Sequence, residues 1–218
     1  MENYKREFID FMIGANVLLF GDFTTKSGRK SPYFINTGNY NTGAQIAKLG
    51  YYYGEGIKNE IGFENFDVLF GPAYKGIPLA CAAALNLYEN YGIDKRYCFN
   101  RKEAKDHGEG GVFVGAKLTD GDRVLIIEDV MTAGTSIRET LPFLKAAANI
   151  TAEHEIISVD RMEKGVNGKT AVREIKEEFG ITVHPIITVL DIIEHLKDTL
   201  SKDFASRMEA YSAQYCEI

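Results

Sequence analysis

Uninterrupted aliphatic runs recur along the chain and are typical of strands that are buried on both faces, as in a parallel sheet. The clearest run is Val-Leu-Ile-Ile at 124–127, and the other expected strands lie at 67–70, 97–100, 155–161 and 182–189. Apolar residues at helical spacing predict helices between and around these strands. The expected helices lie at 4–15, 43–59, 79–88, 135–148, 168–179, 191–198 and 203–215. The pattern predicts an α/β fold with a mostly parallel sheet flanked by helices.

Length and composition fit one domain of this class. The chain has 218 residues, 45% of them hydrophobic and 26% charged, and it contains no internal repeat or low-complexity tract. Its net charge of −6 argues against general binding to nucleic acid or to a membrane surface. An anionic substrate would therefore have to be held by locally placed Lys and Arg side chains.

The cysteines and the N-terminus favour the cytoplasm. Cys81, Cys98 and Cys216 are odd in number and widely spaced, which suggests reduced thiols and neither a disulfide framework nor a zinc site. The first residues lack the apolar core of a signal peptide, and no apolar run approaches the length of a membrane span.

The strand at 124–127 ends in two acids, Glu128 and Asp129, and a turn of small and hydroxyl residues leads from there into the next helix. Ligands bind beyond the carboxyl ends of strands in open parallel sheets. The free N–H groups at a helix N-terminus favour a phosphate, and two neighbouring acids suit the hydroxyls of a sugar. An acidic strand end followed by an ordinary Thr/Ser helix cap is the alternative that the bare pattern leaves open.

The stretch Val-Leu-Ile-Ile-Glu-Asp-Val-Met-Thr-Ala-Gly-Thr-Ser at 124–136 resembles the phosphoribosyl pyrophosphate (PRPP) motif of type I phosphoribosyltransferases. The resemblance implies that Glu128 and Asp129 hold the ribose hydroxyls, although the family often has Asp at the first acid. It also implies a loop that grips the ribose 5′-phosphate, formed by Val130, Met131, Thr132, Ala133, Gly134, Thr135 and Ser136.

A second motif, at 24–34, carries the substrate assignment. Without other information, Lys26 and its basic neighbours would be read as the solvated tip of a hairpin. The segment resembles the Thr-x-Lys-Ser-Gly-x-x-Ser-x-Tyr-Phe signature of the orotate phosphoribosyltransferase family. By this resemblance Lys26 lies at the reacting centre, and the orotate contacts are Lys26, Phe34, Ile35, Thr132 and Arg161.

The segment 71–78 follows another buried strand and contains two Gly and two Pro residues, which mark a tight loop. It could be an ordinary connection between a strand and a helix. The resemblance implies that this loop binds pyrophosphate, with Tyr74 and Lys75 as contacts. It further predicts a cis peptide bond between Ala73 and Tyr74.

The Gly-rich segment 101–111 has no apolar anchor and by itself indicates a surface loop that is mobile without ligand. It resembles the family's catalytic lid, Arg-Lys-x-x-Lys-x-His-Gly. The resemblance implies a homodimer in which the lid reaches the neighbouring subunit's active site. The lid residues expected to contact PRPP are Arg101, Lys102, Lys105 and His107.

Together the resemblances imply that the chain converts orotate and PRPP into orotidine 5′-monophosphate and pyrophosphate, in pyrimidine synthesis. Mg²⁺ would be held mainly by PRPP and water, with no protein ligand assigned. The expected catalytic residues are Lys26, Lys105, His107 and Asp129. A purine phosphoribosyltransferase and a non-catalytic PRPP-binding regulator remain alternatives. A P-loop hydrolase and a Rossmann dehydrogenase lack their glycine motifs.

The expected domain organisation is a single domain, 1–218. Its core comprises about 41–183, and the segments 1–40 and 184–218 form a small hood over the carboxyl edge of the sheet.

Overall fold

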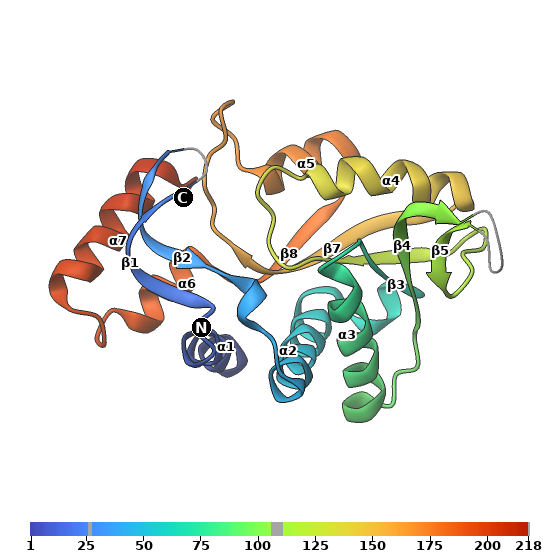
Figure 1. Ribbon diagram of the computed structural model, residues 1–218, viewed down its shortest axis with the longest axis horizontal. Coiled ribbons are helices and arrows are strands. Elements are labelled where there is room, and N and C mark those ends of the chain that lie inside the picture. Colours follow the sequence, from blue (N-terminus) through green and yellow to red (C-terminus); the bar gives the residue numbers. More distant parts are fainter. Residues whose placement is uncertain (26–27, 106–110, 218) are drawn as a thin grey trace.

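The computed structural model describes residues 1–25, 28–105 and 111–217, and its centre is a six-stranded sheet (Figure 1). The strand order is β5-β4-β3-β6-β7-β8, and every neighbouring pair is parallel except β4 and β5. The strands are β3 Val68–Gly71, β4 Arg96–Lys105, β5 Gly111–Gly115, β6 Arg123–Ile127, β7 Thr151–Asp160 and β8 Thr182–Thr188. The α/β class with a mostly parallel sheet is thus confirmed.

Strand β6 lies between β3 and β7 and is buried on both faces, as its unbroken aliphatic run predicts. Leu125 and Ile127 pack into the hydrophobic cluster on one side of the sheet, and Val124 and Ile126 pack into the cluster on the other. The residues that follow β6 therefore start from a rigid position in the middle of the molecule.

Helices cover both faces of the sheet (Figure 1). On one face lie α2 Gly43–Gly56 and α3 Gly76–Tyr91, and on the other lie α4 Thr135–Ala147 and α5 Ala171–Phe179. Helices α2 and α3 approach closely at Gly50, where a Cβ atom would lie 2.6 Å from the carbonyl oxygen of Ala82. A larger residue at this position would push the two helices apart.

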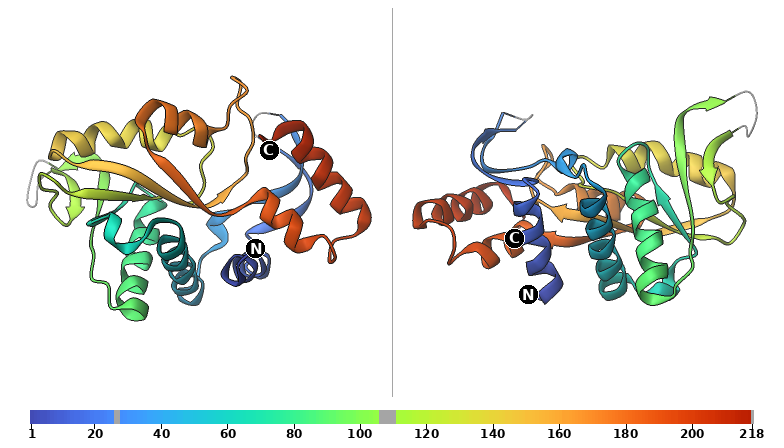
Figure 2. Two further views of the ribbon diagram at one scale, coloured as in Figure 1. Left: turned by 180° about the vertical axis from the view of Figure 1, so that it is seen from behind. Right: turned by 60° about the horizontal axis from the view of Figure 1, so that its bottom comes forward.

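The two ends of the chain lie together beside the carboxyl edge of the sheet (Figures 1 and 2). The antiparallel strands β1 Leu18–Thr24 and β2 Lys30–Ile35 pack with α1 Asn3–Gly14, α6 Val189–Leu196 and α7 Lys202–Tyr215. The short helix η1 Thr37–Asn39 leads from β2 toward α2. The division into a hood (1–40 and 184–218) and a core stays a prediction.

Several expected boundaries were wrong: β7 begins at Thr151 and not at 155, α5 at Ala171 and not at 168, and α6 at Val189 and not at 191. In two further places the type of element differs. Helix α2 ends at Gly56 and continues as the π-helix η2 Ile57–Ile61, followed by the short helix η3 Phe63–Asn65. Strand β4 does not end at Asn100: residues 101–105, expected in a loop, continue it and pair with β5. This ribbon lies at the edge of the sheet, where polar side chains can face water, so it lacks the aliphatic pattern of a buried strand.

In the part of the chain that the structure describes, no helix combines the length and the apolar character that crossing a membrane would need.

Candidate active site

The two acids after β6 are fixed by backbone bonds to β7 that continue beyond the end of the strand. The Glu128 N–H donates to the Ile156 carbonyl at 3.0 Å, and the Ser158 N–H donates to the Asp129 carbonyl at 2.8 Å. The Ser158 hydroxyl donates to the same Asp129 carbonyl. Both carboxyl groups therefore project from a backbone whose position is set by the sheet.

Glu128 is half-buried, and its hydrogen-bond partners are neutral groups. The Ser136 hydroxyl donates to its carboxyl group, and the Tyr53 hydroxyl donates to its backbone carbonyl at 2.5 Å. Burial raises the pKa of Glu128 to about 7, and the charge of Asp129 adds to this effect, while the bond from Ser136 opposes it. Near neutral pH this carboxyl is therefore partly protonated and can donate as well as accept.

Asp129, by contrast, forms an ion pair with a lysine. Its Oδ2 atom accepts from the Lys75 ammonium at 2.8 Å and from the Thr37 hydroxyl at 2.7 Å. Lys75 reaches it from the loop before α3, and Thr37 from η1. The side chain of Asp129 is 12% exposed, so this carboxylate faces a restricted opening.

Residues 130–134 form a loop that leads into the N-terminus of α4. Gly134 precedes the helix with a φ of +64°, and a Cβ atom there would lie 2.6 Å from Ile175 on α5. Arg138 on α4 stabilises the loop, because its guanidinium donates to the Ala133 carbonyl and pairs with Glu178 on α5 at 2.8 Å.

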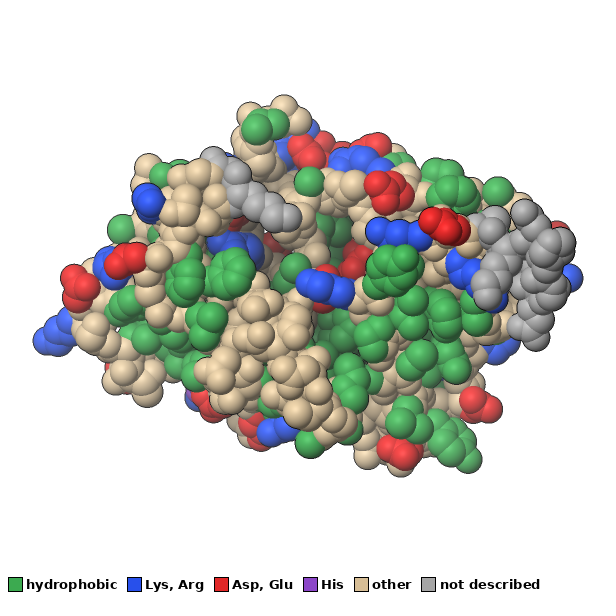
Figure 3. Space-filling view, in the orientation of Figure 1, with side chains coloured by type: hydrophobic (Ala, Val, Ile, Leu, Met, Phe, Trp, Pro, Cys, Tyr) green, Lys and Arg blue, Asp and Glu red, His purple; other side chains and the backbone are tan. Residues whose placement is uncertain are grey.

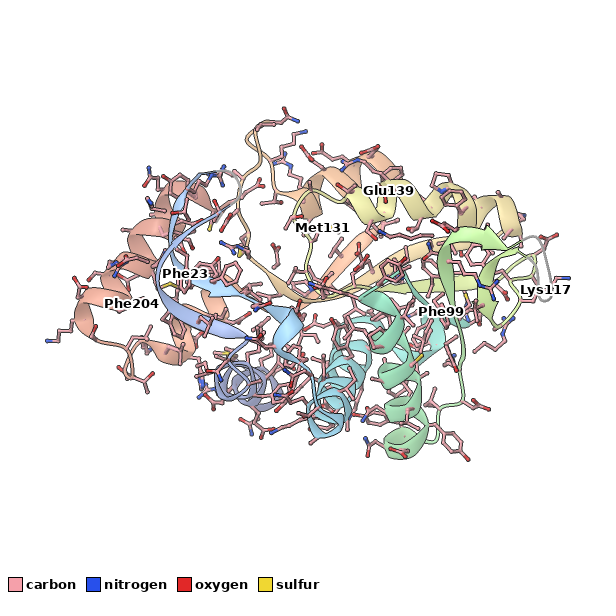
Figure 4. The ribbon with its side chains drawn as sticks, viewed as in Figure 1. Phe23, Phe99, Lys117, Met131, Glu139 and Phe204 are labelled. Carbon is pink, nitrogen blue, oxygen red and sulfur yellow. The ribbon has the colours of Figure 1, made fainter. Side chains whose placement is uncertain are left out.

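The same loop exposes several side chains at the N-terminus of α4, where Gly134 at the N-cap supplies no side-chain hydrogen bond. Thr132, Ala133 and Thr135 are exposed, and Met131 lies on the stretch between β6 and α4 (Figure 4). An unpaired helix N-terminus with hydroxyls beside it is a good site for a phosphate.

The loop at 72–75 follows β3, the neighbour of β6. The peptide bond between Ala73 and Tyr74 is cis, which confirms the prediction. The Ala73 N–H donates to the side chain of Asn100 on β4 at 2.8 Å. The Tyr74 ring is 68% exposed, and the ammonium of Lys102 lies 5.1 Å from its centre. This loop thus brings Tyr74, Lys75 and the basic strand β4 to one place.

A cavity of about 160 Å³ opens between these elements. Its polar wall is formed by Thr37, Lys75, Asp129 and Ser158. Its apolar wall is formed by residues of α2 and α3 and by the residue that follows η1, namely Ile46, Leu49, Tyr53, Pro78, Leu79 and Tyr40.

Arg161 and Phe34 mark the side of the site that faces the terminal segments. Arg161 follows β7, and its guanidinium lies 4.6 Å from the centre of the Tyr33 ring and donates to Glu163 at 2.8 Å. Phe34 is 40% exposed and stacks on Phe23 of β1, with ring centres 5.5 Å apart. Ile35 packs against the hydrophobic core.

Several predicted residues cannot be placed. Lys26 and His107 lie outside the described residues, and for Lys105 the structure describes the backbone within β4 but not the side chain. Arg101 and Lys102 lie on β4. The remaining candidates lie on the loops after β3, β6 and β7 and on β2, with Thr135 and Ser136 in the first turn of α4.

The sequence pattern did not single out several residues that contact the predicted ones, among them Thr37, Tyr53, Ser158 and Glu163. A hydroxyl inside the buried run of β7 is a signal that could have identified Ser158. Thr37 and Tyr53 are distant in sequence from their partners, and their local patterns carry no such signal. Glu163 lies two residues after Arg161, and an acid so close to a predicted basic contact is a signal that could have identified it.

Comparison with known proteins agrees with this geometry. The Phosphoribosyl transferase domain family matches residues 38–183. Orotate phosphoribosyltransferase of Lachnoclostridium phytofermentans is 51% identical over 222 residues, covering 99% of this chain and 98% of that protein. The enzyme of the same name from Clostridium acetobutylicum is 56% identical over 196 residues, covering 90% of this chain and 87% of that protein.

A solved structure gives the same result for the fold. The crystal structure of orotate phosphoribosyltransferase from Francisella tularensis is 41% identical in sequence, covers 96% of each chain and superposes with a TM-score of 0.86. Sequence, fold and the arrangement of the two acids and their loops therefore lead to one conclusion. The chain belongs to the orotate phosphoribosyltransferase family, within the phosphoribosyl transferase domain family.

Proposed function

We propose that this chain transfers the ribose 5-phosphate group of PRPP to orotate, releasing pyrophosphate and forming orotidine 5′-monophosphate for pyrimidine (UMP) synthesis. The observation that carries the proposal is the position of loop 130–136. This segment follows two carboxyl groups directly and leads into the N-terminus of α4. One of the two carboxyl groups, that of Asp129, has its Oδ2 atom 2.8 Å from the ammonium of Lys75 on the neighbouring loop. A phosphate site, a sugar-hydroxyl site and a cation are thus adjacent.

The proposed PRPP contacts follow from the charges of the molecule. The 5′-phosphate binds the N–H groups and hydroxyls of residues 130–136, and Glu128 and Asp129 hold the ribose hydroxyls. Breaking the bond at ribose C1′ places negative charge on the departing pyrophosphate. Tyr74 and Lys75 contact this group, with further cations from Arg101, Lys102 and Lys105 and a further contact from His107.

The proposed orotate contacts lie on the side of the site that faces the terminal segments. Phe34 and Ile35 pack against the pyrimidine, Arg161 pairs with the orotate carboxylate, and Thr132 and Lys26 face the space between the two substrates. Arg161 suits this role because a guanidinium can bind a carboxylate through two parallel hydrogen bonds. In an acidic protein such a local cation is what an anionic base requires.

Mg²⁺ fits the donors of the site. Glu128 and Asp129 offer carboxylate oxygens, and no group of three or more His, Cys, Asp or Glu residues in the described chain could hold a metal. We propose that the ion arrives on PRPP, which together with water supplies most of its ligands. Bound there, it supplies positive charge next to the pyrophosphate.

We further propose a homodimer in which segment 101–111 of one subunit serves the active site of the other. An apolar surface supports an interface. Leu85 and Tyr88 on α3 are 57% and 61% exposed, Tyr97 on β4 is 40% exposed, and hydrophobic side chains gather over this region in Figure 3.

A cytoplasmic enzyme is the expectation that goes with this function. Cys81, Cys98 and Cys216 are all free thiols, which suits a reducing compartment.

A spectrophotometric assay of orotate consumption tests the proposed reaction. The purified chain should consume orotate only when both PRPP and Mg²⁺ are present, and orotidine 5′-monophosphate should accumulate. Turnover of adenine or hypoxanthine without turnover of orotate would instead identify a purine enzyme. PRPP binding without turnover of any base would identify a regulator.

The shared active site has its own test. Lys26→Ala and Lys105→Ala homodimers should each be nearly inactive, because each lacks one cation at every site. After subunit exchange, the heterodimer contains one site with both lysines, so activity should return to as much as about half of the wild-type value per dimer. No recovery after verified exchange contradicts the contribution of Lys105 from the neighbouring subunit.

A further inference from the structure

Thr37 contacts two of the proposed PRPP residues, although it lies far from both in the sequence. Its hydroxyl donates to Asp129 Oδ2 at 2.7 Å and accepts from the Lys75 ammonium at 2.9 Å, and Lys75 also donates to Asp129 at 2.8 Å. The three groups form a closed triangle in the wall of the cavity.

The local structure around Thr37 does not require this hydroxyl. It begins the short helix η1, whose N-cap is Asn36, and the segment is held by other side chains. Asn36 donates to the Asn39 side chain at 3.1 Å, and Asn39 donates to the Asn16 carbonyl at 2.6 Å. The Thr37 hydroxyl is therefore not needed to hold η1, and the bonds described above join it to Asp129 and Lys75.

The hydrogen bonds that Asp129 accepts from Lys75 and from Thr37 should respond differently when PRPP binds. The Lys75 side chain is 61% exposed and would have to turn toward the pyrophosphate when PRPP binds. Thr37 lies on the segment that continues β2 and carries no charge that a phosphate could attract. Once Lys75 has left, Thr37 is the donor that keeps the orientation of the Asp129 carboxylate.

We propose that Thr37 is a positioning residue for PRPP, which fixes the carboxylate of Asp129 against the ribose while Lys75 moves to the pyrophosphate. This inference rests on the proposed roles of Asp129 and Lys75. It adds a residue two positions after Ile35, so the strand that carries the orotate contacts is tied directly to the ribose site.

The expected effect is on PRPP binding. A hydrogen bond to a charged group is stronger than one between neutral groups, and a tenfold change in affinity corresponds to about 1.4 kcal/mol. Thr37→Val keeps the shape of the side chain and removes the hydroxyl, so it should weaken PRPP binding about tenfold. Thr37→Ser keeps the hydroxyl and should bind PRPP within about twofold of wild type.

The experiment measures the Kd of Mg²⁺–PRPP by calorimetry for the full chain and for four variants. These are Thr37→Val, Thr37→Ser, Asp129→Ala and the double variant Thr37→Val/Asp129→Ala. Thermal melting of each variant confirms that it is folded. Steady-state kinetics should show a raised KM for PRPP in Thr37→Val, with kcat and the KM for orotate within about twofold of wild type.

The double variant decides whether Thr37 acts through Asp129. If it does, Thr37→Val changes the Kd less than twofold when Asp129 is already Ala. An equal tenfold loss in both backgrounds overturns the inference, as does wild-type affinity in Thr37→Val or a loss in Thr37→Ser as large as in Thr37→Val. Wild-type PRPP affinity in Asp129→Ala refutes the proposed role of Asp129 itself, which separates the two failures.

Discussion

Glu128 and Asp129 are neighbours in the sequence, yet their surroundings differ in kind. Asp129 is paired with the Lys75 ammonium, whereas the carboxyl group of Glu128 accepts hydrogen bonds from neutral donors, the Ser136 hydroxyl and the Asp129 backbone N–H. Burial raises the pKa of Glu128 from its ordinary value of 4.5 to about 7. Adjacent acids can thus offer a ribose one charged and one partly protonated partner, which avoids placing two full negative charges beside a phosphate.

This difference predicts how stability depends on pH. A carboxyl with a higher pKa in the folded than in the unfolded chain binds more protons when folded, so the free energy of unfolding falls as the pH rises from 4.5 to about 7. Glu128→Gln cannot titrate and should escape this loss. At about 1.4 kcal/mol per pH unit, its advantage over wild type should grow by up to about 3 kcal/mol between pH 5 and pH 8.

Urea unfolding of both proteins without ligand, at pH 5, 6, 7 and 8, measures that difference. Parallel stability curves for wild type and Glu128→Gln would show that the pKa of Glu128 is the same in the folded and unfolded chain.

At the scale of single elements, strand β7 carries a buried acid outside the site, Glu155. Glu155 is 1% exposed, and its Oε2 atom has no hydrogen-bond partner among the described residues. It lies opposite Ile126 on β6 and Val183 on β8, both part of the hydrophobic cluster on that face of the sheet. Burial raises the pKa of Glu155 well above its usual range, and the charge of Glu128 adds to this.

Replacing this acid should stabilise the sheet. A buried polar group without a partner costs about 1–3 kcal/mol, and Val has nearly the volume of Glu. Glu155→Val should therefore raise the free energy of unfolding by about 1–3 kcal/mol at pH 8, measured in urea. Glu153→Val, at an exposed position of the same strand, is the matched control and should stay within about 0.5 kcal/mol of wild type. Destabilisation by Glu155→Val would indicate a native partner for this carboxyl.

Which elements the sequence could predict depended on how they are stabilised. Strand β6 is buried on both faces, so its aliphatic run identified it, and the small residues after it identified the start of α4. The extension of β4 through residues 101–105 is stabilised by pairing with β5, and backbone pairing leaves little trace in side-chain pattern. Thr37 was missed for a related reason, because its partner Asp129 is 92 residues away.

At the scale of the whole molecule, the terminal segments meet the rest of the chain at Glu163. Its Oε1 atom accepts from Arg161 at 2.8 Å and from the Tyr211 hydroxyl of α7 at 2.8 Å, and Oε2 lies 3.7 Å from Arg29. The guanidinium of Arg29 also lies 5.1 Å from the ring centre of Tyr215 on α7. One carboxylate thus connects the proposed orotate residue, the last helix and the start of β2.

Glu163→Gln should disturb both stability and orotate binding. The side chains of Arg161 and Glu163 are 17% and 18% exposed, so losing the charge leaves the guanidinium partly buried with a weaker partner. The free energy of unfolding should fall by about 1–3 kcal/mol, since hydrogen bonds to charged groups are the stronger ones. A less well held Arg161 should raise the KM for orotate about tenfold, while the KM for PRPP stays within about twofold.

Arg207→Gln provides the control, because Arg207 pairs with Asp22, which is 88% exposed, within the terminal segments. Removing that surface pair should change neither KM and should alter stability by less than about 1 kcal/mol. Orotate and PRPP titrations of both variants, with urea unfolding, separate the possibilities. An equal rise in both KM values for Glu163→Gln would mean that Glu163 supports the fold in general, and a lower KM for orotate would mean that it competes with the substrate carboxylate for Arg161.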